Sequence, residues 1–109
     1  MELRELQKII HAYAREKGWW DGPERPVGDQ FVNFHAEISE AWEEWRNGHT
    51  MDDIYLKDGK PEGVPIELAD CVIRILDTCE KYGINLEDAI MCKHKYNMTR
   101  PYRHGGKKA

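Results

Sequence analysis

Long apolar runs and paired cysteines are both missing from this chain of 109 residues. No stretch approaches the roughly 18 consecutive apolar residues of a membrane helix, and the N-terminus lacks the charged-then-apolar pattern of a signal peptide. The three cysteines, Cys71, Cys79 and Cys92, form no CxxC pair, which argues against a zinc site. We therefore expect a cytoplasmic protein whose three thiols are reduced and lie in the core.

Negative charge dominates most of the chain and is missing from its end. Residues 1–92 hold 10 Lys and Arg against 20 Asp and Glu, whereas residues 93–109 hold 6 basic residues and no acid. An acidic body repels phosphate, so this pattern argues against a surface for duplex DNA. It favours a small polyanion that binds between a cation-loaded acidic site and basic side chains.

Apolar periodicity and turn residues predict four helices and one β-hairpin within a single domain over residues 1–109. The expected helices cover residues 2–17, 29–47, 65–82 and 85–100. Asp29 and Asn85 are the expected N-caps of the second and fourth helices. Asp58 and Gly59 predict the turn of a short hairpin over 54–64. The fold class is therefore all-α with a small hairpin, and residues 101–109 form an irregular tail.

The second predicted helix carries an apolar arc of about 100° with an acidic stripe directly beside it. We expect the arc to face the core; its members are Phe31, Phe34, Ile38, Ala41, Trp42 and Trp45. The stripe consists of Asn33, Glu37, Glu40 and Glu44, whereas Glu43 points toward solvent. Three glutamates thus share a ridge that flanks the expected core.

The third predicted helix is apolar over more than half of its circumference. Its polar stripe consists of Glu67, Asp70, Arg74 and Asp77. A helix with such a wide apolar surface is buried on two sides, and four short helices supply few partners for it. We therefore expect a homo-oligomer, at least a dimer.

The two acidic stripes offer two pairs of carboxylates, Glu37 with Glu40 and Glu67 with Asp70. Residues three apart are neighbours on a helix, so four carboxylates beside a core repel one another unless a cation neutralises them. Mg²⁺ prefers such oxygen ligands. The alternative is that both pairs lie on solvated helix faces, because each short motif is common by itself.

The fourth predicted helix presents basic and amide donors on its packing face. Leu86, Ala89 and Ile90 are expected to pack inward, and the same face continues into three further residues. These are Lys93, Asn97 and Arg100, at spacing i, i+4, i+7. Donors on a packing face are suited to anionic oxygens. The alternative is a frayed, solvated helix end.

These motifs together resemble the MazG-like nucleoside triphosphate pyrophosphohydrolases, an all-α superfamily. The resemblance covers about residues 30–107 and rests on Glu37-Ile-Ser-Glu40, on Glu67-Leu-Ala-Asp70 and on KHKYNMTRPYRHGGK from Lys93 to Lys107. It implies a four-helix MazG-like bundle that forms a homo-oligomer, a dimer or tetramer, with its active site near a subunit interface.

The resemblance also implies a reaction and its ligands. The reaction is hydrolysis of a nucleoside triphosphate, with the deoxy form favoured, to the monophosphate and pyrophosphate, in the service of cleaning the nucleotide pool. Mg²⁺, with Mn²⁺ as a substitute, is implied to bind Glu37, Glu40, Glu67 and Asp70. Lys93, Asn97 and Arg100 match positions that bind phosphate oxygens. One carboxylate is suited to orient or deprotonate the attacking water, and we favour Glu40.

Two further segments extend the expected site. His11 and Trp20 resemble residues of a base pocket in dCTP-cleaving relatives; the alternative is that Trp19 and Trp20 are core or interface anchors. Arg103, His104 and Lys107 in the tail are candidates for contacts to the triphosphate; the alternative is a disordered solubilising end.

Two other functions stay open at the level of sequence. One is a non-catalytic oligomeric helical module that binds a nucleotide or a protein, although such a module has no need of four carboxylates. The other is nucleic-acid binding through the basic tail, which the acidic body disfavours.

Overall fold

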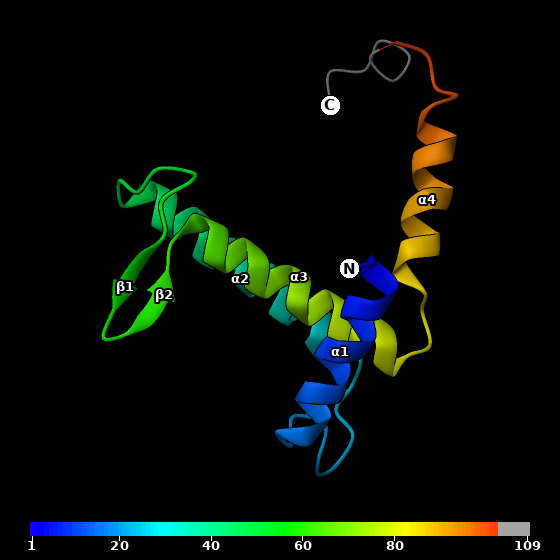
Figure 1. The fold of residues 1–109 in the computed structure, drawn as a ribbon, viewed down its shortest axis with the longest axis horizontal. Helices are drawn as coiled ribbons and strands as arrows, with labels where there is room; N and C mark the ends of the chain where they lie inside the picture. Colours follow the sequence, from blue (N-terminus) through cyan, green and yellow to red (C-terminus); the bar gives the residue numbers. More distant parts are fainter. Residues whose placement is uncertain (103–109) are drawn as a thin grey trace.

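A computed structural model describes residues 1–102, and the predicted four helices and hairpin are all present in this range. The elements are α1 (Leu3–Glu16), α2 (Gly28–Arg46), β1 (Tyr55–Lys57), β2 (Lys60–Glu62), α3 (Val64–Lys81) and α4 (Leu86–Asn97). The fold is mostly helical with one small antiparallel hairpin (Figure 1). The predicted tail contacts Arg103, His104 and Lys107 lie outside the described residues.

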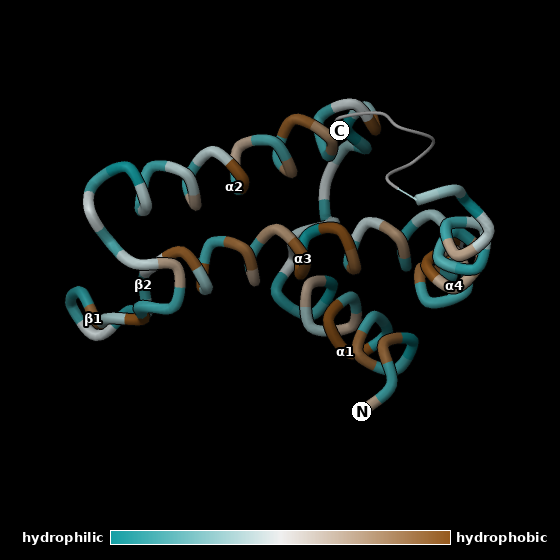
Figure 2. The backbone as a smooth tube through the Cα atoms, turned by 90° about the horizontal axis from the view of Figure 1, so that it is seen from above, coloured by the Kyte–Doolittle hydropathy of each residue, from teal (hydrophilic) through white to brown (hydrophobic). Residues whose placement is uncertain are grey.

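Helix α3 is the central element of the fold. It packs against both α2 and α1, and β2 contacts it as well. Seen from above, α3 lies between α2 and α1 (Figure 2). The buried apolar residues of the described range are Ala14, Ala41, Val64, Cys71, Leu76 and Cys79, and four of these six belong to α3. Helix α3 thus packs against two neighbouring helices, but its apolar residues Leu68 and Val72 remain 40% and 50% exposed within one chain.

The hairpin forms as its turn residues predict. Asp58 and Gly59 both have positive φ, 53° and 77°, which is the conformation that a two-residue hairpin turn requires. The strands pair Tyr55 with Glu62 and Lys57 with Lys60. This register places Glu62 one residue before the glycine that precedes α3.

The N-terminus of α3 depends on that glycine. Gly63 has φ 125°, and a Cβ atom at this position would lie 2.2 Å from the backbone oxygen of Asp53. Only glycine therefore permits this approach of the chain to the loop before β1. The close contact fixes the hairpin against the first turn of α3, where Pro65 lies as expected.

The predicted N-cap of α2 is wrong. Val27 precedes the first helical residue, Gly28, and Asp29 lies inside the first turn. The reason is a preceding turn: the N–H of Asp29 already donates to the carbonyl of Pro26 at 3.0 Å. The predicted cap of α4 is confirmed, because the side chain of Asn85 accepts a hydrogen bond from the N–H of Asp88 at 3.2 Å.

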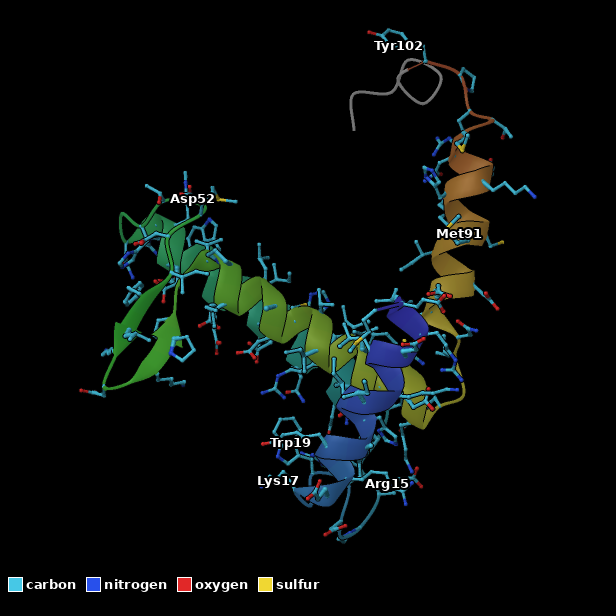
Figure 3. All side chains as sticks on the ribbon, viewed as in Figure 1. Arg15, Lys17, Trp19, Asp52, Met91 and Tyr102 are labelled. Atoms are coloured by element: carbon cyan, nitrogen blue, oxygen red, sulfur yellow. The ribbon has the colours of Figure 1, made fainter. Side chains whose placement is uncertain are left out.

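A buried glutamine connects α1 to the junction between α3 and α4. Gln7 donates to Glu80 at 2.9 Å and to the carbonyl of Ile84 at 2.7 Å, and it accepts from the N–H of Leu86 at 3.3 Å. Beyond this anchor α4 leads away from the other helices (Figures 1 and 3). No residue of α4 is buried. The prediction that Ala89 and Ile90 pack inward is therefore wrong within one chain.

The predicted core face of α2 is also wrong within one chain. Of its six residues only Ala41 is buried, whereas Trp42 is 52% exposed and Phe31, Ile38 and Trp45 are exposed as well. The neighbouring acidic stripe faces α3 instead, and its member Glu37 is buried. Helix α2 therefore turns its acidic stripe inward and leaves its aromatic face open.

The open aromatic face includes an apolar groove of about 380 Å³ beside the hairpin. It is lined by Ile38, Ala41, Trp42, Trp45, Met51, Val64 and Leu68.

Two more expectations can be compared with the described residues. Cys71 and Cys79 are free, buried thiols, as predicted, but Cys92 is exposed on α4 because that helix buries none of its residues within the chain. Among residues 1–102, no helix is long and apolar enough to cross a membrane.

Candidate metal centre

Helices α2 and α3 run in opposite directions, because the hairpin between them reverses the chain (Figure 1). This arrangement brings together three of the four predicted metal ligands. Carboxylate oxygens of Glu37, Glu67 and Asp70 all lie within 4.8 Å of one another. Glu37 and Glu67 are buried, whereas Asp70 is exposed. The cluster thus has a buried floor and a side that opens to solvent.

The fourth predicted ligand, Glu40, belongs to the same group of charges. Burial, a hydrogen bond to Glu40 and the nearby charges of Glu40, Asp70 and Glu37, in that order of size, raise the pKa of Glu67 to about 7. The raised pKa shows that negative charge on Glu67 is unfavourable among these acids, and a bound divalent cation would relieve that repulsion. Glu40 itself is exposed, so solvent reaches it.

Glu67 also takes part in a second cluster that the sequence pattern did not reveal. Oxygens of Glu44, Glu62 and Glu67 lie within 4.8 Å of one another. Glu44 is in the predicted acidic stripe, but Glu62 comes from β2, and only the fold of the hairpin could reveal its position. Tyr55 on β1 donates its hydroxyl to both oxygens of Glu44, at 3.0 and 2.8 Å. The hairpin therefore supplies both a carboxylate and a donor that fixes another.

Glu37 lies at the floor of the cluster. Its Oε1 atom accepts a hydrogen bond from Nε of Arg74 at 2.8 Å. Its Oε2 atom is buried and has no hydrogen-bond partner among the described residues. Burial raises the pKa of Glu37, and the charge of Arg74 offsets only part of that effect. A buried carboxylate oxygen without a partner is costly, which makes Oε2 a natural ligand for a cation.

The donor set fits a hard divalent cation. All candidate ligands are carboxylate oxygens, which suit Mg²⁺ or Mn²⁺ and do not suit softer metals. The unpartnered Oε2 of Glu37 and the open side at Asp70 match a site that combines protein ligands with water or phosphate oxygens.

His11 and Trp20, the candidate base-pocket residues, meet at the far end of α3. Nδ1 of His11 lies 2.6 Å from Oδ1 of Asp77, and the indole nitrogen of Trp20 lies 3.0 Å from each carboxylate oxygen of Asp77. The two rings also touch edge to face, with their centres 5.9 Å apart. Asp77 is thus the acceptor that orients both rings, a role that the sequence pattern did not assign to it.

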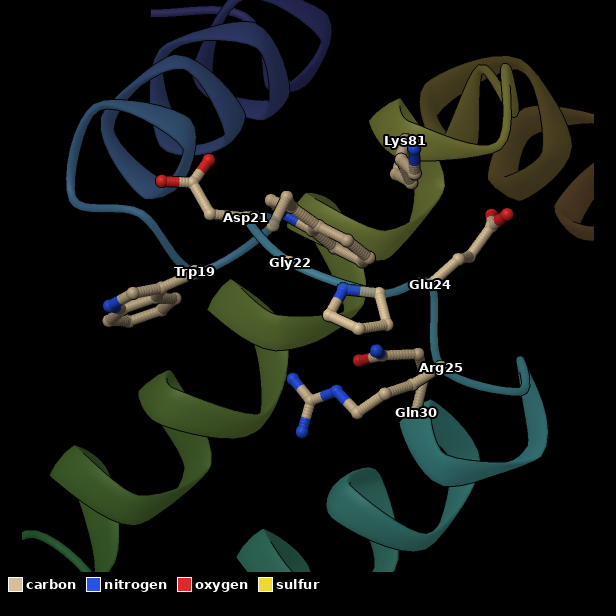
Figure 4. A pocket seen from close by; sticks show the side chains of 9 residues that line it. Trp19, Asp21, Gly22, Glu24, Arg25, Gln30 and Lys81 are labelled. Carbon is tan, nitrogen blue, oxygen red and sulfur yellow. The ribbon is translucent and has the colours of Figure 1, made fainter.

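The loop between α1 and α2 forms cavities over this end of α3. One, of about 380 Å³, is lined by Trp19, Trp20, Arg25, Gln30, Asn33, Arg74 and Asp77. A smaller one of about 170 Å³ adjoins it through Trp19, Trp20, Arg25 and Gln30. Figure 4 shows Arg25 and Gln30 close together below the loop that carries Trp19. We call the larger space the tryptophan cavity; Arg74 links it to the carboxylate cluster through Glu37.

The predicted phosphate-binding residues do not join the cluster within one chain. Lys93 and Asn97 are exposed on α4, which leads away from α2 and α3 (Figure 1). The ammonium of Lys93 instead lies over the ring of Tyr96, 4.9 Å from its centre. Arg100 follows the end of α4 and is half-buried.

No family model, no curated protein and no solved structure matches this chain. A function must therefore be inferred from the chain's own residues, above all from the geometry of the carboxylates and of the tryptophan cavity.

Proposed function

We propose that this protein hydrolyses nucleoside triphosphates, deoxy forms in preference, to the monophosphate and pyrophosphate, with Mg²⁺ as cofactor. The observation that carries the proposal is the unpartnered, buried Oε2 of Glu37 in a group of converging carboxylates. The MazG-like motifs point to the same residues. Removal of unwanted nucleotides from the cellular pool is the role that we assign to this reaction.

Metal binding and nucleoside binding take place at opposite ends of α3 in this proposal. The carboxylate end, with Glu37, Glu40, Glu67 and Asp70, would hold the metal, which would neutralise the charge of the phosphates. The tryptophan cavity, about 380 Å³ in volume, receives the nucleoside. An aromatic wall suits a flat base, and stacking alone tolerates every base.

Water attacks the α-phosphorus, its oxygen forms the new bond, and the bond to the bridging oxygen breaks as pyrophosphate leaves. A bound Mg²⁺ would supply charge neutralisation for the phosphate oxygens. Glu40 accepts the proton of the attacking water, because it is the solvent-exposed partner of buried Glu67. Glu37 and Glu67 remain fixed at the floor of the site.

A second copy of the chain completes the site in this proposal. The open aromatic face of α2 and the unpacked α4 are the two surfaces that need a partner. If the α4 of one subunit packs on another subunit, Lys93, Asn97 and Arg100 reach phosphate oxygens there. Mixed oligomers of inactive Glu40→Gln and Lys93→Gln chains should then regain activity, because some sites combine two intact halves. Mixed oligomers without any regained activity would show that one chain supplies both halves.

The reaction is tested by pyrophosphate release from a panel of dNTPs and NTPs, with Mg²⁺ and with a chelator. Wild type should release pyrophosphate only with the metal, and Glu40→Gln should not. Glu43→Gln is the matched control, because Glu43 lies on the same helix, 51% exposed and paired with Arg46 outside the cluster. A folded protein that releases none from any nucleotide would instead be a binding module.

A further inference from the structure

Arg74 contacts two parts of the proposed site at once. Its Nε atom donates to Oε1 of Glu37 at 2.8 Å, so it neutralises the most buried ligand of the carboxylate cluster. The same side chain lines the tryptophan cavity, together with Arg25. Its side chain is 41% exposed, whereas that of Glu37 is only 9% exposed. The guanidinium is therefore the more accessible partner of this pair, and the carboxylate is the more enclosed one.

A divalent cation and Arg74 compete for Glu37. Like charges a few ångströms apart repel each other, and the repulsion is stronger in a partly buried site than in bulk water. A metal on the free Oε2 of Glu37 therefore weakens the bond from Arg74 to Oε1. The tryptophan cavity, which Arg74 already lines, is open to the guanidinium, and Asp77 in that cavity is already occupied by His11 and Trp20.

We infer that Arg74 is an exchangeable counter-ion: it neutralises Glu37 in the metal-free protein, and it turns to an anionic group in the tryptophan cavity once a divalent cation binds Glu37. Metal binding and anion binding are thereby coupled with positive sign. The anionic group that fits between the cluster and the cavity is the α-phosphate of a nucleotide. This last step rests on the proposed function, whereas the competition for Glu37 does not.

The competition is tested by calorimetric titration with Mn²⁺ at pH 8 and without nucleotide. Arg74→Gln should bind Mn²⁺ about fivefold to tenfold more tightly than wild type, because the competing charge is gone. Arg74→Lys keeps the positive charge and should stay near wild type. Arg46→Gln is the matched control, since Arg46 pairs with Glu43 away from the cluster. Equal or weaker binding by Arg74→Gln would overturn the inference.

The coupling is tested by binding of the four deoxynucleoside monophosphates, each measured with and without Mn²⁺. The factor by which Mn²⁺ tightens their binding should fall at least threefold in Arg74→Gln. An unchanged factor would show that Arg74 does not turn to the anion. If wild type hydrolyses nothing but the Mn²⁺ shift is present, the proposed function is wrong and the competition for Glu37 stands.

Discussion

Helix α3 carries two buried carboxylates, Glu67 near its start and Asp77 near its end. Other acids surround Glu67, whereas hydrogen-bond donors surround Asp77. Their exposed fractions are nearly equal, 8% and 6%. Asp77 accepts hydrogen bonds from His11 and Trp20. Glu67 has other carboxylates close by, and its pKa rises to about 7.

Two equally buried carboxylates on one helix, Glu67 and Asp77, therefore differ in role. A buried carboxylate that is supplied with donors is already satisfied, and it serves to orient the groups that surround it. A buried carboxylate among other acids is unsatisfied until a cation arrives. The partners of a buried acid, more than its burial, distinguish a structural residue from a ligand.

The largest expected effect is the loss of activity when Glu67, and not Asp77, is replaced. Glu67→Gln should lower Mg²⁺-dependent pyrophosphate release about 100-fold or more, because it removes the carboxylate that both acidic clusters share and that we propose as a metal ligand. Steady-state kinetics with a range of Mg²⁺ concentrations measures this loss. If Glu67→Gln keeps wild-type kcat and the same Mg²⁺ dependence, Glu67 is not a ligand.

The second expected effect is a difference between Glu67 and Asp77 in their contributions to the free energy of unfolding. Asp77→Asn should lower the free energy of unfolding by about 2–3 kcal/mol, because His11 and Trp20 lose an anionic acceptor and the new amide N–H faces their donors. Glu67→Gln should raise it in the metal-free protein at pH 8, because a repelled charge is removed. Urea denaturation with a chelator present measures both. Changes of the same sign in the two variants would contradict the comparison.

The sequence predicted the elements better than it predicted their contacts. Local signals were sufficient for the hairpin turn at Asp58-Gly59 and for the cap at Asn85. They were also sufficient to pair Glu37 with Glu67 and Asp70, because helical spacing and a reversing connection place these residues on facing helices.

What the sequence could not supply depends on tertiary packing. Glu62 joins the cluster only through the register of the hairpin, and Asp77 gains its donors from α1 and the following loop. The apolar arc of α2 was predicted to face the core of the chain. Hydrophobic periodicity identifies an apolar face, but it does not identify the element that packs against it. Within one chain α3 packs against the neighbouring stripe, and Trp42 stays open.

The third effect is the contribution of Glu67 to the pH dependence of stability. Its pKa of about 7 in the folded protein exceeds its ordinary value of 4.5, so the folded state binds the proton more tightly than the unfolded state. The resulting stabilisation is complete below about pH 4.5 and is lost as the pH rises through 7.

This loss should be on the order of 2 kcal/mol between pH 5 and pH 8 in the metal-free protein. Unfolding curves across that range, measured for wild type and Glu67→Gln, isolate the contribution. The variant should have the flatter profile, and parallel profiles would exclude Glu67 as the source.

The smallest expected effect is on metal affinity, and it concerns Glu44, which accepts a hydrogen bond from Tyr55. Tyr55→Phe removes the hydroxyl that donates to Glu44 and leaves the ring in place. The affinity for Mn²⁺ should fall only by roughly threefold, because Glu44 is less well oriented but still present. Calorimetric titration measures the change. A loss as large as that of Glu67→Gln would mean that the hairpin, and not α3, organises the site.

The central place of α3 has a consequence for how the protein is made. Helices α1 and α2 leave the ribosome first, yet the surface on which both pack is synthesised later, at residues 64–81. Until then the sides of α1 and α2 that pack on α3 have no partner, and incompletely packed chains of this kind are prone to aggregation. A slow stretch of translation before residue 64 would prolong this exposed state, whereas rapid synthesis through α3 would shorten it.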